Sequence, residues 1–67
     1  MNRDYFKIGE FLRIENSSSP NHGQIAQLIQ RRPWRGRLQL KNGQTFNYLY
    51  TRLRRPTFRE LIQEAIK

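Results

Sequence analysis

Asn42-Gly43 separates two short runs of alternating residues, Arg37–Lys41 and Thr45–Thr51. Asn-Gly between such runs is the strongest short-range signal for a β-hairpin, because both residues accept the left-handed backbone that a tight turn requires. The sequence therefore predicts a hairpin at the centre of the chain.

The apolar pattern decides the register of this hairpin. A two-residue turn would place the leucines of the first strand opposite polar residues. A three-residue loop with a left-handed Gly43 instead pairs Leu38 with Phe46, and a one-residue slip would turn every side chain to the other face. We predict the three-residue loop, with aromatics in the core rather than exposed for stacking. The expected apolar face holds Leu38, Leu40, Phe46, Tyr48 and Tyr50, and the expected polar face holds Arg37, Gln39, Thr45 and Asn47.

The segment around the hairpin carries the net charge of the whole chain. Residues 31–55 contain eight of the thirteen basic side chains and no Asp or Glu, while the other residues contain five basic and five acidic side chains. The formal charge of +8 therefore comes from this segment alone. An arginine-rich hairpin with aromatics predicts a surface that binds an anion, first of all a nucleic acid.

Arginine outnumbers lysine ten to three. The planar guanidinium binds phosphate or carboxylate through two donors and stacks on flat rings, so its excess favours a contact surface. A genome that favours arginine codons would also raise this ratio, but it explains the gathering of charge in one segment less well.

Length and composition limit the chain to a single domain, residues 1–67, with a small core. It has no Cys for a disulfide, and one His without a carboxylate cluster excludes the ordinary zinc patterns. Neither an apolar run of about 20 residues nor a signal peptide is present, so we expect a cytoplasmic domain. His22 is expected to be a loop residue, and without a triad, phosphate loop or paired carboxylates we expect neither an enzyme nor a cofactor.

Two more strands are expected before the hairpin. Phe11–Glu15 alternates, with Leu12 and Ile14 on one face, and the turn-rich residues 16–23 that follow predict a mobile loop suited to contacts. The apolar residues of Gln24–Gln30 fit either a strand or a helix. We predict a strand, because Gly and Pro bracket only nine residues.

The end of the chain predicts an α-helix over residues 58–67. Thr57 and Glu60 form a capping box, in which each side chain binds a backbone N–H at the start of the helix. A helix this short is not stable alone, so we expect its apolar side to close the open end of a barrel, or else to enter a groove of a partner. The apolar stripe consists of Phe58, Leu61, Ile62, Ala65 and Ile66.

Four or five short strands with frequent turns and one terminal helix indicate a mainly β fold, a small barrel. The stretch from Ile8 to Ile14, followed by a loop and by Gly23–Leu28, resembles the KOW pattern of SH3-like barrels, in which Gly and an acid open one strand and a second Gly opens the next. The resemblance spans roughly Ile8 to Leu53. It implies contacts with RNA, DNA or the transcription and translation machinery.

Two other groups of proteins are similar in architecture. Small archaeal chromatin proteins also place a helix after an SH3-like barrel, which implies DNA binding in the nucleoid, although this chain uses arginine where they use lysine. The strand pattern also resembles the SH3-like subunit of photosystem I that helps to dock ferredoxin. That likeness implies an acidic protein partner, and one fold accommodates both functions.

The candidate nucleic-acid contacts lie in two clusters and on the hairpin between them. Around Trp34 we expect either a phosphate clamp with the indole stacked on a base, or an indole half-buried under guanidinium groups. After the last strand we expect either a backbone track or a solvated junction, and on the hairpin either base-edge contacts or an ordinary exposed face. The candidates are Arg31, Arg32, Trp34, Arg35, Arg37, Gln39, Lys41, Arg52, Arg54 and Arg55.

Overall fold

The computed structural model describes residues 6–65, with the backbone alone at Ala65. The elements in chain order are β1 (Phe11–Ile14), β2 (Ile25–Arg31), β3 (Arg35–Gln39), β4 (Thr45–Leu49), the 3₁₀ helix η1 (Tyr50–Arg52), β5 (Leu53–Arg54) and α1 (Phe58–Ala65). Each strand that the sequence predicts is present, although the last predicted strand, Thr45–Thr51, ends at Leu49 where η1 begins, and β5 follows η1. Within the described residues, no helix is long and apolar enough to cross a membrane.

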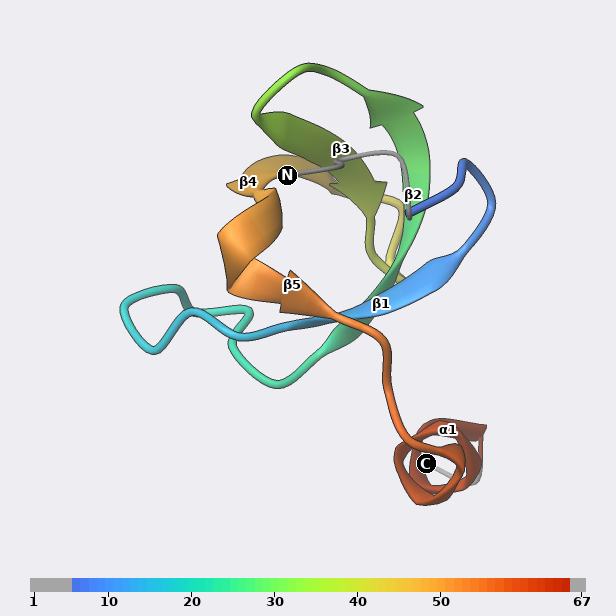
Figure 1. Ribbon diagram of the computed structural model, residues 1–67. Helices are drawn as coiled ribbons and strands as arrows, with labels where there is room; N and C mark the ends of the chain where they lie inside the picture. Colours follow the sequence, from blue (N-terminus) through green and yellow to red (C-terminus); the bar gives the residue numbers. More distant parts are fainter. Residues whose placement is uncertain (1–5, 66–67) are drawn as a thin grey trace.

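The five strands form one antiparallel sheet in the order β4-β3-β2-β1-β5. The sheet curls strongly, and η1 connects its two edge strands (Figure 1). The prediction of a mainly β fold with a C-terminal helix is confirmed. The sheet does not close into a complete barrel, because β4 and β5 remain separate edges in the described chain. This strand order is compatible with an SH3-like fold.

The predicted hairpin register is confirmed. Leu38 lies opposite Phe46, and the backbone N–H of Leu40 donates to the carbonyl of Gln44 over 2.8 Å. Gly43 has a φ of 92°, the left-handed conformation that the three-residue loop requires. Leu38 and Leu40 are buried while Gln39 between them is exposed, so the apolar pattern correctly predicts which face points inward.

β2 is a strand, as predicted, and not a helix. The sheet register shifts between Leu28 and Gln30, so the strand contains a bulge there. Ala26 and Leu28 are buried, whereas Ile29 lies at the bulge and is exposed. The bulge explains why the apolar residues of this segment do not alternate regularly.

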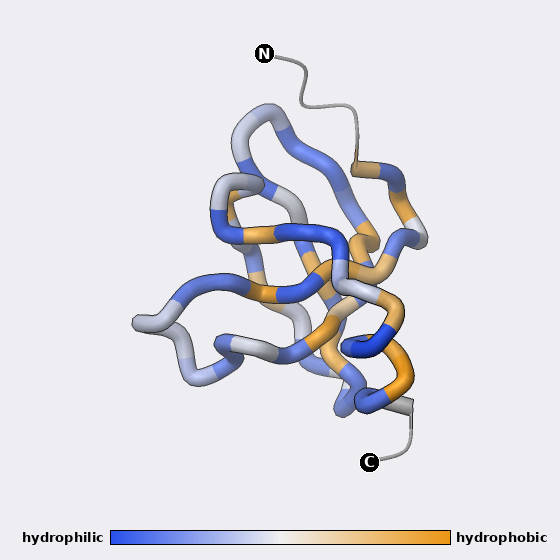
Figure 2. The backbone as a smooth tube through the Cα atoms, turned by 60° about the horizontal axis from the view of Figure 1, so that its bottom comes forward, coloured by the Kyte–Doolittle hydropathy of each residue, from blue (hydrophilic) through white to orange (hydrophobic). Residues whose placement is uncertain are grey.

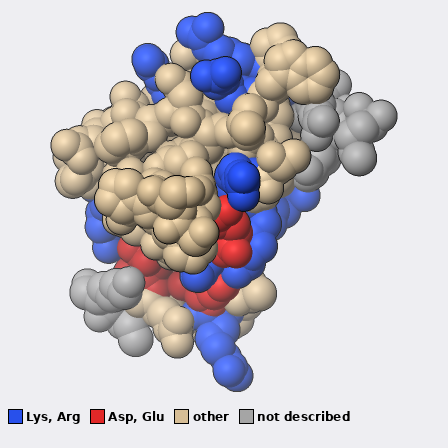
Figure 3. All heavy atoms as spheres, turned by 90° about the vertical axis from the view of Figure 1, so that its left-hand side faces the viewer, with Lys and Arg blue, Asp and Glu red and all other residues tan. Residues whose placement is uncertain are grey.

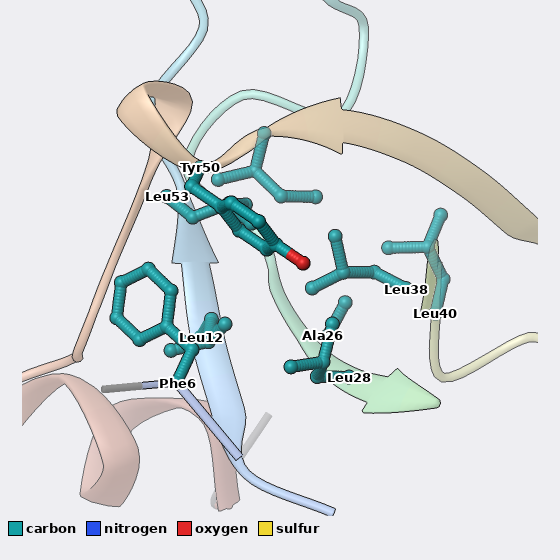
Figure 4. Packing of buried hydrophobic residues seen from close by; sticks show 9 residues of the cluster. Phe6, Leu12, Ala26, Leu28, Leu38, Leu40, Tyr50 and Leu53 are labelled. Carbon is teal, nitrogen blue, oxygen red and sulfur yellow. The ribbon is translucent and has the colours of Figure 1, made fainter. Parts of the chain in front are cut away.

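The core fills the concave side of the sheet (Figure 4). Tyr50 is buried at one end of it and packs against Phe6 with ring centroids 6.1 Å apart, and Phe46 and Tyr48 cover its flank. Along the strands, hydrophobic and hydrophilic residues alternate as the curled sheet requires (Figure 2). The aromatics of the hairpin therefore belong to the core, as predicted. The buried residues are Phe6, Leu12, Ile14, Ala26, Leu28, Leu38, Leu40, Tyr50 and Leu53.

The loop predicted between β1 and β2 is present and is fixed by polar contacts. Ser19 Oγ lies 2.7 Å from the hydroxyl of Tyr48, and the side-chain amide of Asn21 donates to the same hydroxyl over 3.1 Å. Asn21 is buried, so these bonds satisfy polar atoms that water does not reach. The loop is thereby tied to the edge strand β4.

The capping box of α1 is confirmed, but the predicted role of the helix is wrong. The N–H of Thr57 donates to Glu60 Oε1 over 2.8 Å, and the N–H of Glu60 donates to Thr57 Oγ1 over 3.2 Å. The helix stands beside the sheet at the end of an extended connection (Figure 1) and does not close the barrel. Phe58 is 79% exposed and Ile62 44%, so part of the apolar stripe has no cover within the described chain.

Candidate nucleic-acid interface

The β2–β3 hairpin ends in a tight turn with Pro33 and Trp34 at its tip. Arg31 lies opposite Gly36, and the N–H of Arg32 donates to the carbonyl of Arg35 over 2.9 Å. Trp34 is 67% exposed. The interpretation of Trp34 as half-buried over the barrel is therefore wrong, because most of the residue's surface is exposed.

A buried tyrosine holds this turn in place. The hydroxyl of Tyr50 donates to the carbonyl of Arg32 over 2.6 Å and accepts from the N–H of the same residue over 3.1 Å. The N–H of Tyr50 also donates to the carbonyl of Trp34 over 3.3 Å. Because the tyrosine ring belongs to the core, the tip is connected to the most rigid part of the molecule.

A glycine allows this close approach. A Cβ on Gly36 would lie 2.5 Å from Cδ1 of Leu28 and 3.1 Å from Cε1 of Tyr50. Both distances are shorter than carbon atoms tolerate without movement. Gly36 therefore lets β3 pass directly over the tyrosine that anchors the tip.

Beside the tip, the convex face of the sheet carries two rows of polar side chains. Residues that lie directly opposite in neighbouring strands project from the same face. One row is Gln30, Arg37 and Asn47, and the row next to it is Gln27, Gln39 and Thr45. These side chains are exposed or partly exposed and include no carboxylate. Amides and guanidinium groups on one face can donate to and accept from base edges.

The carboxylates gather in another part of the molecule, beside β1 and on α1. Glu60 accepts from both terminal nitrogens of Arg54 over 3.0 and 2.7 Å, and it lies 3.2 Å from Arg13. The hydrogen bonds from Arg54 and from the backbone of Thr57 lower the pKa of Glu60 to about 2. A hydrogen bond from Arg13 also lowers the pKa of Glu15.

Three of the predicted contact residues lie among these carboxylates. Arg54 pairs with two of them, Arg55 pairs with Glu10, and Lys41 Nζ lies 4.0 Å from Glu64 Oε1. Their charges are already partly neutralised within the fold. The second predicted cluster is therefore divided, because only Arg52 of that cluster lacks a carboxylate within 4.0 Å in the described part of the chain.

Four of the remaining predicted residues lie at the β2–β3 turn, and we call them the basic tip: Arg31, Arg32, Trp34 and Arg35. Arg37 and Gln39 belong to the polar rows beside it. Arg52 lies beside β1 instead, where its backbone carbonyl accepts from the N–H of Glu15 over 2.7 Å. Among residues 6–65, no carboxylate lies within 4.0 Å of Arg32, Arg35 or Arg37. On the face drawn in Figure 3, acidic side chains occur only in the lower half, toward α1, while basic side chains at the top have no acidic neighbours. Positive potential is therefore strongest around the β2–β3 turn.

Four residues of the polar rows were missed as candidates from the sequence: Gln27, Gln30, Thr45 and Asn47. The predicted register had placed Thr45 and Asn47 on the polar face of the hairpin with Arg37, which is a usable signal. The two glutamines join the rows only through pairing with β3, and the bulge in β2 hides that register from the sequence.

Within the described residues, no group of His, Asp and Glu side chains is arranged to hold a metal ion. The chain matches none of the known protein families, characterised proteins or solved structures with which it was compared.

Proposed function

We propose that the protein binds nucleic acid through the basic tip and the two polar rows beside it. The observation that carries this proposal is the separation of charge. The carboxylates of the described chain neutralise Arg13, Arg54, Arg55 and Lys41, whereas no carboxylate of residues 6–65 lies within 4.0 Å of Arg32, Arg35 or Arg37. Like charges held together repel each other in the free protein, and a phosphate backbone relieves that repulsion.

The two parts of the surface have different roles in this proposal. The arginines of the tip contact phosphates and supply most of the affinity. Arg37, Gln39 and the amides beside them meet base edges. Trp34 stacks on a base or ribose, which is worth about 1–3 kcal/mol for each stacked base.

Arg54 and Arg55 have a different role here from the one that the sequence suggested. They bind the carboxylates that position α1 and the start of β1. The KOW-like pattern and the SH3-like strand order support a role in transcription, translation or nucleoid function. These features leave DNA and RNA as alternative ligands.

The test compares two double variants that remove the same charge from different places. Arg32→Gln with Arg35→Gln alters the tip, while Lys7→Gln with Arg59→Gln alters exposed cations elsewhere. Fluorescence anisotropy with labelled DNA and RNA would measure the affinity at several salt concentrations. Loss of two phosphate contacts makes the plot of log K against log salt shallower by about 1.4–1.8. The tip variant is expected to show this change and the control is not; equal effects would refute the proposed location.

The exposed apolar residues of α1 favour a second candidate function, an SH3-like interaction module that docks an acidic protein. Phe58 and Ile62 would pack against that partner while the tip supplies charge complementarity. The same two double variants distinguish the functions when an acidic protein replaces the nucleic acid as titrant. Binding to the protein alone would favour docking.

A further inference from the structure

A cleft of about 480 Å³ lies between α1 and the convex face of the sheet. Phe11, Ile25 and Leu40 line one side of it and Leu61 of the helix lines the other. Its volume lies within the range that is typical of small-ligand sites in proteins, about 300–1,000 Å³. The cleft is largely apolar, but two amides and one ammonium group also reach it.

The cleft continues one of the polar rows of the candidate interface. Phe11 lies opposite Gln27, which lies opposite Gln39, which lies opposite Thr45. The row therefore crosses the sheet from the edge strand β4, at the end away from the β2–β3 turn, to β1 beside α1. Arg37 projects from the same face two residues before Gln39, about 7 Å along the strand. A polymer that lies along these rows leads directly into the cleft.

We propose that this cleft takes an unstacked nucleobase, so that the ligand of the protein is a single-stranded nucleic acid. The inference rests on the proposed function and deepens it. A base in a duplex is held in its stack and its pair, and it cannot enter a site between a helix and a sheet without being turned out.

The aromatic wall of the cleft suits the face of a base. Phe11 is 52% exposed, whereas Leu12, the next residue of β1, is buried. Leu61 of α1 also lines the cleft. An aromatic and an aliphatic side chain in one site offer a base a sequence-tolerant apolar surface.

The amides suit the edge of a base. The side-chain nitrogen of Gln27 donates to the carbonyl of Gly9 over 3.2 Å, and that of Gln39 donates to the carbonyl of Gly43 over 3.5 Å. These bonds direct each amide, and within the described chain neither side-chain oxygen accepts a hydrogen bond. Two such acceptors favour a base with an exocyclic amino group, as in adenine, cytosine and guanine, over uracil.

A cation stands at the rim for the adjoining phosphate. Lys41 donates to the backbone carbonyl of Glu64 over 3.4 Å and its ammonium lies 4.0 Å from the carboxylate of the same residue. This contact is long and exposed, so the ammonium can exchange it for a phosphate oxygen at small cost. The carboxylate of Glu64 also lines the cleft and would repel a phosphate placed on its own side.

The experiment uses a matched pair of phenylalanine variants of the whole chain. Phe11→Ala removes the wall of the cleft, and Phe58→Ala removes an equally large ring from the same neighbourhood that does not line it. Fluorescence anisotropy would follow binding of 12-residue oligoadenylate, oligocytidylate and oligouridylate, and of a duplex of mixed sequence. Circular dichroism would establish that each variant is folded.

We expect the parent protein to bind oligoadenylate and oligocytidylate more tightly than oligouridylate. Phe11→Ala is expected to weaken binding of single strands at least about fivefold, from the loss of one stacked base, and to leave duplex binding unchanged. Phe58→Ala should have no effect on either. Equal effects of the two variants, or an equal loss for single strands and duplex, would overturn the inference.

A second measurement keeps the inference testable if Phe11→Ala does not fold. In the parent protein, nuclear magnetic resonance would follow the side-chain amide signals of Gln27 and Gln39 during titration with oligoadenylate. Shifts of both signals are expected, and unchanged signals in a saturated complex would refute the site while leaving the proposed function intact. Failure of the parent protein to bind any of the oligonucleotides would instead refute the proposed function.

Discussion

Replacing Tyr50 by Phe tests whether the buried tyrosine holds the basic tip in place. The ring stays in the core against Phe6, and only the hydroxyl is lost. That hydroxyl donates to the carbonyl of Arg32 over 2.6 Å and accepts from its N–H over 3.1 Å. The same N–H also donates to Arg35, so the second bond is shared and is only partly lost.

One full and one shared hydrogen bond correspond to a loss of about 1–2 kcal/mol in the free energy of unfolding. In a domain of this size, that loss lowers the melting temperature by roughly 4–16 °C. Urea unfolding followed by circular dichroism measures the first quantity. Exchange of the Arg32 amide hydrogen, measured by nuclear magnetic resonance, reports the opening of the tip itself.

Tyr48→Phe is the matched control, because its hydroxyl contacts Ser19 and Asn21 in the loop before β2. It should destabilise the protein by a similar amount and leave the exchange of Arg32 unchanged beyond the global effect. Loss of the Tyr50 hydroxyl should also weaken nucleic-acid binding several-fold. A change below about 0.3 kcal/mol in stability, with unaltered exchange at Arg32, would refute the anchoring role of Tyr50.

Three further changes test other contacts. Gly36→Ala should cost about 1–3 kcal/mol in urea unfolding, because its Cβ would meet Leu28 at 2.5 Å; a neutral result would mean that β3 moves aside easily. Thr57→Ala removes the N-cap and should lower the helical circular dichroism signal at a cost of about 1 kcal/mol, whereas Thr57→Ser should retain it. Acid should release α1: Glu60 has a lowered pKa of about 2 in the folded protein, so its stabilising pairing with Arg54 is complete above the ordinary pKa near 4.5 and is lost as the pH falls toward 2. The helical circular dichroism signal should fall across that pH range in the parent and less steeply in Glu60→Gln. Parallel pH curves for the two proteins would contradict the role of the Glu60–Arg54 pair in holding α1.

The elements with strong local signals were predictable from the sequence. The Asn42-Gly43 turn and the alternation around it determine a register that the structure confirms at Leu38 and Phe46. The capping box of Thr57 and Glu60 likewise depends on residues three positions apart. In both cases the deciding interactions lie within a few residues along the chain.

Contacts between distant segments were not predictable in this way. Glu60 was expected as a helix cap, but its pairing with Arg54 and Arg13 arises only when α1 meets the sheet. Two predicted contact residues, Arg54 and Arg55, are thereby bound to carboxylates, which charge counting along the sequence does not reveal. The position of α1 beside the sheet, rather than over its open end, depends on the same long-range pairs.

One part of the candidate site was predictable from the sequence, and another part was not. The tip around Trp34 was predicted from the arginines of one turn, and the structure gives those residues a common, exposed location. The amide rows required the pairing of β2 with β3, and a bulge at Ile29 breaks the periodicity that would have indicated it.

The central claim is that the basic tip binds phosphates, and the salt dependence of binding tests it most directly. Fluorescence of Trp34, the only tryptophan, would follow titrations with single-stranded and duplex nucleic acid over a series of salt concentrations. If the three arginines of the tip each neutralise one phosphate, log K falls with log salt at a slope of about −2.1 for single strands or −2.7 for a duplex. A slope near zero, or a fluorescence signal that does not change on binding, would contradict the account.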